Sequence, residues 1–234
     1  MLESYIALDL ETTGLSPKHD KIIEIGALKV VDGVVTDRFS KFVNPARKLE
    51  ERIVELTGIQ DEQLEGAPYI EEILGELLEF LGDLPLLGHR ILFDYSFLKK
   101  AAVDGKRSFE KQGVDTLRIA RRYLSELPHK NLIFLCEYYG IPHQAHRAFH
   151  DAEATHLLYR QLAELFYKEE EKELFLPTPL HYAVKRDTPA TKPQKERLYR
   201  LLSQHNITLE ADVDKLTRSE ASRIIDRILT QYGR

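Results

Sequence analysis

Three apolar runs near the start of the chain constrain its fold more than any other feature. They cover residues 5–11, 22–31 and 34–43, and each is typical of a β-strand. Asp32 and Gly33 join the second run to the third, and this pair is a strong hairpin signal because both turn positions tolerate positive φ. We therefore expect three antiparallel strands at this end of the chain.

After residue 43 the pattern changes to helical spacing. In Tyr69–Leu81 the apolar side chains recur every three or four residues, as they do on one face of a helix. A brief strand is expected in PLLGH, residues 85–89. The expected helices span residues 49–56, 69–81, 93–103, 116–124, 131–139 and 149–167. Such alternation predicts a mixed α/β sheet covered by helices.

A charged and proline-rich stretch divides the chain. The run KEEEKE, residues 168–173, breaks the apolar periodicity, and several prolines follow it up to Pro193. Beyond it, residues 194–205 and 219–232 have the pattern of two amphipathic helices. The expected division is a main domain (1–170), a linker (171–191) and a small helical module (192–234).

The composition excludes several classes of protein. No apolar run approaches the ~20 residues needed to cross a bilayer, and the first ten residues carry an acid where a secretory signal has basic residues. Cys136, the single cysteine, lies in an apolar segment and is expected to be a buried packing thiol. We expect a cytoplasmic protein without a membrane partner.

The charge is distributed unevenly. The formal net charge of −5 argues against a protein that coats nucleic acid through bulk electrostatics. From His181 onward, however, 11 Lys and Arg stand against 7 Asp and Glu, so the preceding segment carries the whole acidic excess. The two parts are expected to do different jobs.

Two acids at the end of the first strand indicate a metal site. Alternate side chains of a strand share a face, so Asp9 and Glu11 point the same way. Two carboxylates held this close repel and raise each other's pKa unless a cation compensates them. Carboxylate oxygens suit Mg²⁺ or Mn²⁺. Taken alone, such a pair is far more often a residue that begins a turn, here Asp9, and a capping residue, here Glu11.

Further motifs recur in a definite order. Asp94 lies near the start of a helix in GHRILFDYSFL, Asp115 begins DTLRIARRYL, and His146 precedes Asp151 by five positions in HRAFHDAEAT. Together with ALDLETTGL and IIEIGALKV, this set resembles the DEDDh exonuclease family, which includes the proofreading subunits of bacterial replicative polymerases, ribonuclease T and oligoribonuclease. The resemblance covers about the first 170 residues. It implies a ribonuclease-H-like α/β fold with a mixed five-stranded sheet flanked by helices.

The resemblance also implies a role for each motif residue. Asp9, Glu11 and Asp151 would hold one Mg²⁺ or Mn²⁺ ion, Asp9 would reach a second ion, and Asp94 would hold that second ion largely through water. His146 would be the general base, since a near-neutral pKa allows histidine to take up and release a proton. Two such ions are able to orient an attacking water and stabilise the departing oxygen.

A zinc site is the alternative for the histidines. His143, His146 and His150 are close in sequence, and a spacing of four residues permits shared ligation on a helix. The segment has neither paired cysteines nor an H-E-x-x-H pattern, and the spacing of His146 and Asp151 matches the exonuclease better.

Other residues are expected to contact substrate. The turn after the first strand would receive the terminal nucleotide through backbone N–H groups and an apolar contact. Phe97 is a candidate for base stacking, although phenylalanines four apart on a helix are more often core. The expected substrate-binding residues are Thr12, Thr13, Gly14, Leu15 and Phe97. Glu24 is expected to be a hydrogen-bonded structural acid, and Arg90 replaces the Asn that relatives commonly have.

The expected function is a metal-dependent 3′-to-5′ exonuclease that releases mononucleotides from single-stranded DNA ends. The alternatives are an RNA-trimming 3′ exoribonuclease with the same site, and a catalytically silent nucleic-acid-binding accessory protein. A polymerase or sliding clamp is a further candidate partner, because EKELFLP (171–177) faintly resembles a clamp-binding peptide. In the module, the candidates for tracking a strand backbone are Lys192, Lys195, Arg197 and Arg200. The alternative for them is a solvated helix face or a docking module.

Overall fold

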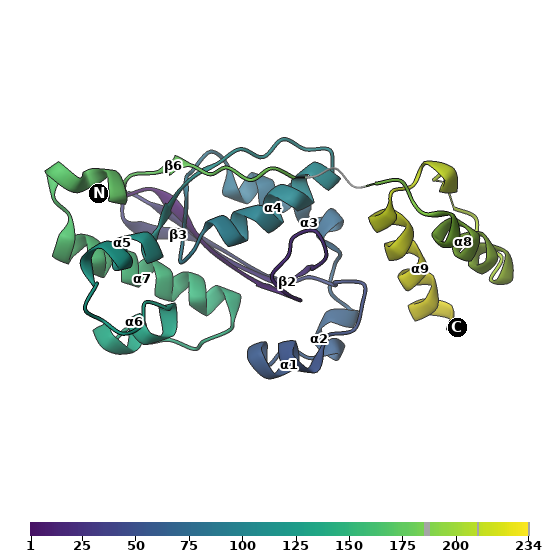
Figure 1. Cartoon of the computed structure of the whole chain (residues 1–234), viewed down its shortest axis with the longest axis horizontal. Helices are drawn as coiled ribbons and strands as arrows, with labels where there is room; N and C mark the ends of the chain where they lie inside the picture. Colours follow the sequence, from purple (N-terminus) through teal and green to yellow (C-terminus); the bar gives the residue numbers. More distant parts are fainter. Residues whose placement is uncertain (185–187, 210, 234) are drawn as a thin grey trace. The chain divides into compact units, whose positions relative to one another are not determined.

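Figure 1 shows a computed structural model of the chain, which describes residues 1–184, 188–209 and 211–233. The chain divides into two compact units. The larger comprises Met1–Pro45 and Leu49–Val184, and the smaller comprises Ala46–Lys48 and Lys185–Arg234.

The larger unit is built on a mixed sheet with the strand order β3-β2-β1-β4-β5-β6. The strands are β1 (Tyr5–Thr12), β2 (Ile22–Val31), β3 (Val34–Phe42), β4 (Leu86–Gly88), β5 (Gln112–Asp115) and β6 (Thr178–Pro179). β1, β2 and β3 are antiparallel, β4 and β5 run parallel to β1, and β6 is antiparallel to β5. Asp32 and Gly33 have φ angles of 50° and 78°, which confirms the predicted hairpin turn.

The predicted α/β fold is confirmed, with six strands in place of the expected five. The sixth strand comes from a segment that the sequence analysis assigned to a linker. There, η1 (Glu169–Phe175) and β6 belong to the larger unit. Phe175 is fully buried against Tyr123 and Tyr159, and this packing leads the chain back to the edge of the sheet.

Helices cover both faces of the sheet (Figure 1). α3 and α4 pack on one face, and α5, α6 and α7 pack on the other. A short unpredicted helix, α2, follows α1. The bounds are α1 (Glu51–Thr57), α2 (Asp61–Glu65), α3 (Ile70–Leu81), α4 (Leu92–Asp104), α5 (Thr116–Tyr123), α6 (Leu132–Tyr139) and α7 (Ala148–Phe166).

The alternation of side chains along β1 determines where its acids point. Ile6 and Leu8 belong to the core beneath α3 and α4, whereas Tyr5 and Ala7 belong to the core beneath α5, α6 and α7. Because strand side chains alternate, Asp9 and Glu11 continue the face that α7 covers.

The backbone of α7 lies very close to the sheet at Gly26 of β2. A Cβ added at Gly26 would lie 2.1 Å from both the carbonyl carbon of Ala148 and the amide nitrogen of Phe149. Gly26 is the ladder partner of Asp9. Only glycine therefore allows the start of α7 to lie beside the acids of β1.

The smaller unit contains α8 (Lys192–Gln204), η2 (Val213–Lys215) and α9 (Arg218–Tyr232). Thr191 and Thr217 each form a capping box, with Gln194 and Glu220 as partners, so the sequence specifies both helix starts. The apolar core of this unit includes Leu198, Leu201, Val213, Ala221, Ile225 and Ile228. Across the described ranges, no helix has both the length and the apolar content needed to cross a membrane.

The close packing at Gly26 predicts that adding one methyl group there will lower the stability of the protein considerably. Gly26→Ala should destabilise the protein by about 2–3 kcal/mol, because the backbone of α7 must move. Gly75→Ala is the matched control: its Cβ meets nothing within 4 Å in α3, and it should stabilise by about 0.5–1 kcal/mol. Urea unfolding measures both changes, and a Gly26→Ala protein as stable as the parent would contradict the packing.

Candidate active site

The sheet brings several acidic segments to one edge. β1, β4 and β5 are parallel, so their carboxyl ends lie at the same edge, where α/β proteins commonly bind ligands. Glu11 lies at the end of β1, Asp94 lies in the first turn of α4 after β4, and Asp115 ends β5. α7 adds Asp151 from its first turn.

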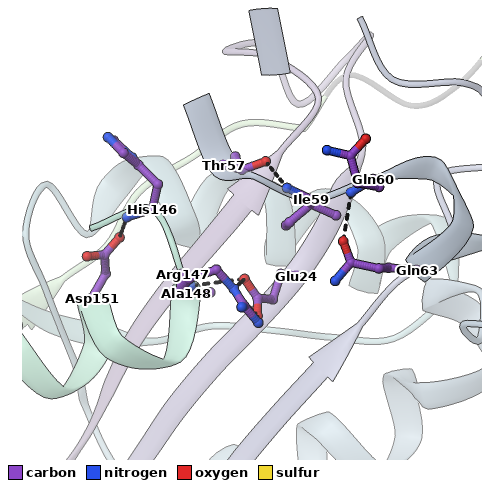
Figure 2. A network of polar contacts seen from close by, with 9 residues as sticks. All are labelled: Glu24, Thr57, Ile59, Gln60, Gln63, His146, Arg147, Ala148 and Asp151. Atoms are coloured by element: carbon purple, nitrogen blue, oxygen red, sulfur yellow. Dashed lines mark hydrogen bonds and ion pairs between the residues drawn. The ribbon is translucent and has the colours of Figure 1, made fainter. Parts of the chain in front are cut away.

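An ion pair with a buried carboxylate and a partly exposed guanidinium attaches the start of α7 to β2 (Figure 2). Arg147 donates to the Glu24 carboxylate from Nη2 at 2.9 Å and from Nε at 3.3 Å, and the amide of Ala148 donates to the same carboxylate at 3.1 Å. Glu24 is only 2% exposed and is the ladder partner of Glu11. The Ala148 bond also satisfies a free N–H group of the helix terminus. Glu24 is thus a hydrogen-bonded structural acid, as predicted.

Next to this pair, the backbone turns sharply at His146. Its φ is 63°, an uncommon value for a residue other than glycine. The His146 amide donates to Oδ2 of Asp151 at 3.0 Å (Figure 2), which links the turn to the first turn of α7. Among the described residues, only Glu11, His146 and Asp151 form a group of three possible metal ligands, with their ligand atoms all within 4.8 Å of one another.

His143 is a partner of Asp151 that the sequence analysis considered only for a zinc site. Its Nε2 lies within hydrogen-bond distance of Oδ1 of Asp151, and both side chains are buried. Within the described residues, the group of possible metal ligands contains neither His143 nor His150. The zinc alternative therefore gains no support. In the sequence, His143 is marked only by its closeness to His146 and Asp151. Closeness in sequence does not tell which way a side chain points, so its contact with Asp151 could not be predicted.

Asp94 reaches the same place from the other side of the sheet. Its Oδ1 accepts a hydrogen bond of 3.1 Å from the amide of Leu10, and the side chain is almost fully buried. Because Leu10 lies between Asp9 and Glu11, this bond holds the Asp94 carboxylate next to both acids of β1.

The acids are packed closely enough to change one another's ionisation. Burial, followed by the charges of Asp94, Asp151 and Glu11, raises the pKa of Asp9 well above its usual range. Burial and the charge of Asp151 raise the pKa of Glu11 to about 8. Burial raises the pKa of Asp94 to about 8, against the opposing effect of the Leu10 amide.

The pKa of Asp151 is also raised by burial, and its contacts with His143 and His146 oppose that rise. Without a cation, the ionised form of this cluster is therefore unfavourable. A divalent cation would compensate the repulsion, and carboxylate oxygens are the ligands that Mg²⁺ and Mn²⁺ prefer.

The expected substrate-binding residues fall into two groups. Thr12 and Thr13 are buried at the end of β1, where the Thr12 hydroxyl donates to the Gly14 carbonyl at 2.7 Å, and Leu15 is 79% exposed at the rim. Phe97 is 3% exposed, with its ring packed against Phe93 in the core. Leu15 is thus accessible to a nucleotide, and Phe97 is not.

Arg90 lies in a second strained turn at this edge. It has φ of 77°, its amide donates to Asp115 at 2.8 Å, and its exposed guanidinium lies over the Phe93 ring at 5.9 Å. Its charge lowers the pKa of Asp94. Asp115 also caps α5 through the Leu117 amide at 2.9 Å, a structural role that its position before a helix could have indicated.

Comparison with known proteins places this geometry in a family. The sequence model of the RNase T family, described as Exonuclease, matches residues 6–159. A curated relative named DNA polymerase III PolC-type, from Halalkalibacterium halodurans, is 32% identical over 250 residues, covering 98% of this chain and 17% of that protein. Its namesake from Clostridium perfringens is 40% identical over 154 residues, covering 65% and 11%. The chain therefore spans less than a fifth of the length of these relatives.

Solved structures share the fold. Exonuclease X in complex with 5′ overhanging duplex DNA has a TM-score of 0.56 and 22% identity, covering 72% of this chain and 95% of that one. The nuclease domain of 3′hExo, described as a DEDDh family member bound to rAMP, has a TM-score of 0.59 and 18% identity, covering 69% and 92%. By the match over residues 6–159, which covers more than half of the chain, this chain belongs to the RNase T family of exonucleases.

Proposed function

We propose that this chain is a metal-dependent 3′-to-5′ exonuclease that hydrolyses the terminal phosphodiester bond of single-stranded DNA and releases mononucleotides. The observation that carries the proposal is the convergence of ligand atoms from Glu11, His146 and Asp151 within 4.8 Å, beside the carboxylates of the partly buried Asp9 and the buried Asp94. These residues come from β1, α4 and α7 and from the turn before α7.

The residues fit two Mg²⁺ or Mn²⁺ ions. The raised pKa values of Glu11 and Asp94 support this fit, because the nearby charges of Arg147 and Arg90 lower these pKa values without offsetting the rise, and all four carboxylates offer hard oxygen ligands. Asp9, Glu11 and Asp151 would hold one ion, and Asp9 and Asp94 would hold the other. When bound, the ions would activate water and neutralise charge on the scissile phosphate.

The remaining chemistry belongs to the chain. His146 would accept the proton of the attacking water, because one of its ring nitrogens lies within 4.8 Å of carboxylate oxygens of Glu11 and Asp151, and its backbone amide donates to Asp151. Leu15 would contact the terminal base, and the turn formed by Thr12, Thr13 and Gly14 would receive the sugar and phosphate. Phe97 has no part in this proposal because it is buried.

DNA is the proposed substrate because the relatives are named DNA polymerase III PolC-type. Their name also supports a cytoplasmic location and a polymerase as partner. RNA is the second candidate, since 3′hExo is described with the ribonucleotide rAMP. The clamp is not retained, because Phe175 of the EKELFLP segment is buried in the core. A silent accessory protein is less favoured, because the acids and His146 converge.

The first test is digestion of end-labelled oligonucleotides. The full chain should release mononucleotides from the 3′ end of single-stranded DNA when Mg²⁺ or Mn²⁺ is present, and EDTA should stop the reaction. Asp9→Ala should abolish activity, because it removes a carboxylate that would help to hold both ions. Unchanged turnover in Asp9→Ala would refute the assigned site, and a wide preference for the matching RNA would refute the choice of DNA.

His146 and His143 both contact Asp151, so their alanine variants form a matched pair that tests the proposed general base. His146→Ala should lower kcat by about 10²–10⁴-fold at every metal concentration, because the proton acceptor is lost. His143→Ala removes only a partner of Asp151, so it should weaken metal binding by about tenfold and recover most of kcat at saturating metal. Metal titrations of kcat distinguish the two, and recovery of His146→Ala at high metal would contradict its role as base.

The raised pKa values predict how stability depends on pH. Glu11 and Asp94 keep their protons up to a pKa of about 8 in the folded, metal-free chain. The unfolded chain loses them at ordinary carboxyl values, roughly pH 4. The folded state therefore binds more protons in this window, and stability should fall as pH rises from about 5 to 8.

Melting in EDTA should show this fall, and saturating Mg²⁺ should stabilise the chain more at pH 8 than at pH 5.5. Equal stability at both pH values in EDTA would contradict the electrostatic description of the site.

A further inference from the structure

The larger unit carries an excess of negative charge, which does not favour the binding of a negatively charged nucleic acid. The larger unit contains 20 Lys and Arg against 31 Asp and Glu, whereas the smaller unit contains 13 against 7. Nucleic acid carries one charge per phosphate, and proteins bind it mainly by placing Lys and Arg next to phosphates. If the proposed function holds, the cations available for the strand are concentrated in the smaller unit.

Within that unit, α8 presents cations on its outer side. Lys192, Arg197 and Arg200 are exposed, while Leu198 and Leu201 point into the core of the unit. We call Lys192, Arg197 and Arg200 the α8 basic face. From Lys192 to Arg200 the helix rises about 12 Å, which is the length of a few nucleotides stacked at about 3.4 Å each.

Internal contacts leave these cations largely available. Lys192 approaches Glu196 only to 3.9 Å, with both side chains mostly exposed, and such a pair contributes little. Arg200 makes no hydrogen bond or ion pair with any residue that the structure describes, and Arg197 acts on Asp226 only at a distance. Lys195 is different: its ammonium donates to the carbonyl oxygen of Asp214 at 2.8 Å and to its carboxylate at 3.1 Å.

A half-exposed aromatic ring lies next to these cations in the sequence. Tyr199 is 49% exposed, and its hydroxyl donates to the Asp214 carboxylate at 3.2 Å, which restrains the ring. Surfaces that bind single strands without sequence preference combine cations along the backbone with aromatic rings for the bases. Both parts are present on α8.

We propose that the α8 basic face, with Tyr199, binds the single-stranded part of the substrate away from the end that is being cut. This inference rests on the proposed function and assigns the smaller unit to substrate retention. Because both units belong to one chain, a strand held by α8 stays at a raised local concentration for the catalytic unit. Lys195 of the sequence-based candidates is excluded, because it holds η2 in place.

The salt dependence of binding tests the proposal in the full chain. The triple variant Lys192→Gln, Arg197→Gln, Arg200→Gln should lose about two units from the slope of log affinity against log salt, since each single-strand phosphate contact contributes about 0.7. Its KM for long single-stranded DNA should rise and its kcat should stay unchanged. Tyr199→Leu should weaken binding about tenfold without changing the slope.

The control removes the same charge elsewhere. Arg38→Gln, Lys106→Gln, Arg107→Gln takes three exposed cations from the larger unit, and its slope and KM should equal those of the parent. A dinucleotide substrate has no further strand for α8 to bind, so the parent and all three variants should cleave it equally. Thermal unfolding should show that each protein keeps its fold.

The outcomes separate this inference from the proposed function. If the triple variant has the parental slope and the parent chain still digests DNA, only the role of α8 is overturned. The basic residues of α8 are then a solvated face or part of a protein-docking module. A parent chain without metal-dependent nuclease activity overturns the proposed function. In that case, binding of labelled single-stranded DNA in EDTA still tests α8, because the slope does not require turnover.

Discussion

The site depends on holding several carboxylates together against their mutual repulsion. The start of α7 must lie close to β1 for Asp151 to meet Glu11, and two features of β2 provide this. Gly26 leaves room for the backbone of α7, and Glu24 binds both the Arg147 guanidinium and the Ala148 amide. The attachment is made by residues that are not themselves proposed metal ligands.

This arrangement explains why the ionised acids destabilise the metal-free chain. Burial and like charges raise the pKa of Glu11 and of Asp94 to about 8, so near neutral pH the cluster is frustrated unless a cation is present. Frustration of this kind is expected where function requires a cation. The strained turns at Arg90 and His146 lie at the same edge, and each is stabilised by a carboxylate, Asp115 or Asp151.

The two units divide the charge of the chain between them. The larger unit concentrates acids, which a metal site requires but which repel a polyanion at long range. The smaller unit has its own apolar core and two capped helices, and it carries the positive excess. If the proposed function and the proposed role of α8 both hold, the larger unit provides the chemistry and the smaller unit provides affinity, so binding and turnover can change independently.

Local patterns in the sequence were sufficient for much of the fold. The Asp32-Gly33 hairpin, the apolar face of α3, the capped helices of the small unit and the shared face of Asp9 and Glu11 all follow from periods of two or 3.6 residues and from turn chemistry. The family resemblance followed from spacing in the same way, because the motifs are short and occur in a fixed order.

Contacts between distant residues were decided only by the tertiary structure. β6 forms because the packing of Phe175 brings two residues back to the edge of the sheet, and neither residue signals a strand. Arg147 meets Glu24 across 123 residues, and His143 reaches Asp151 only because of the turn at His146. The same packing buries Phe97 and exposes Leu15, although both are apolar. Periodicity states which residues share a face, and only the packing of the whole unit determines what that face meets.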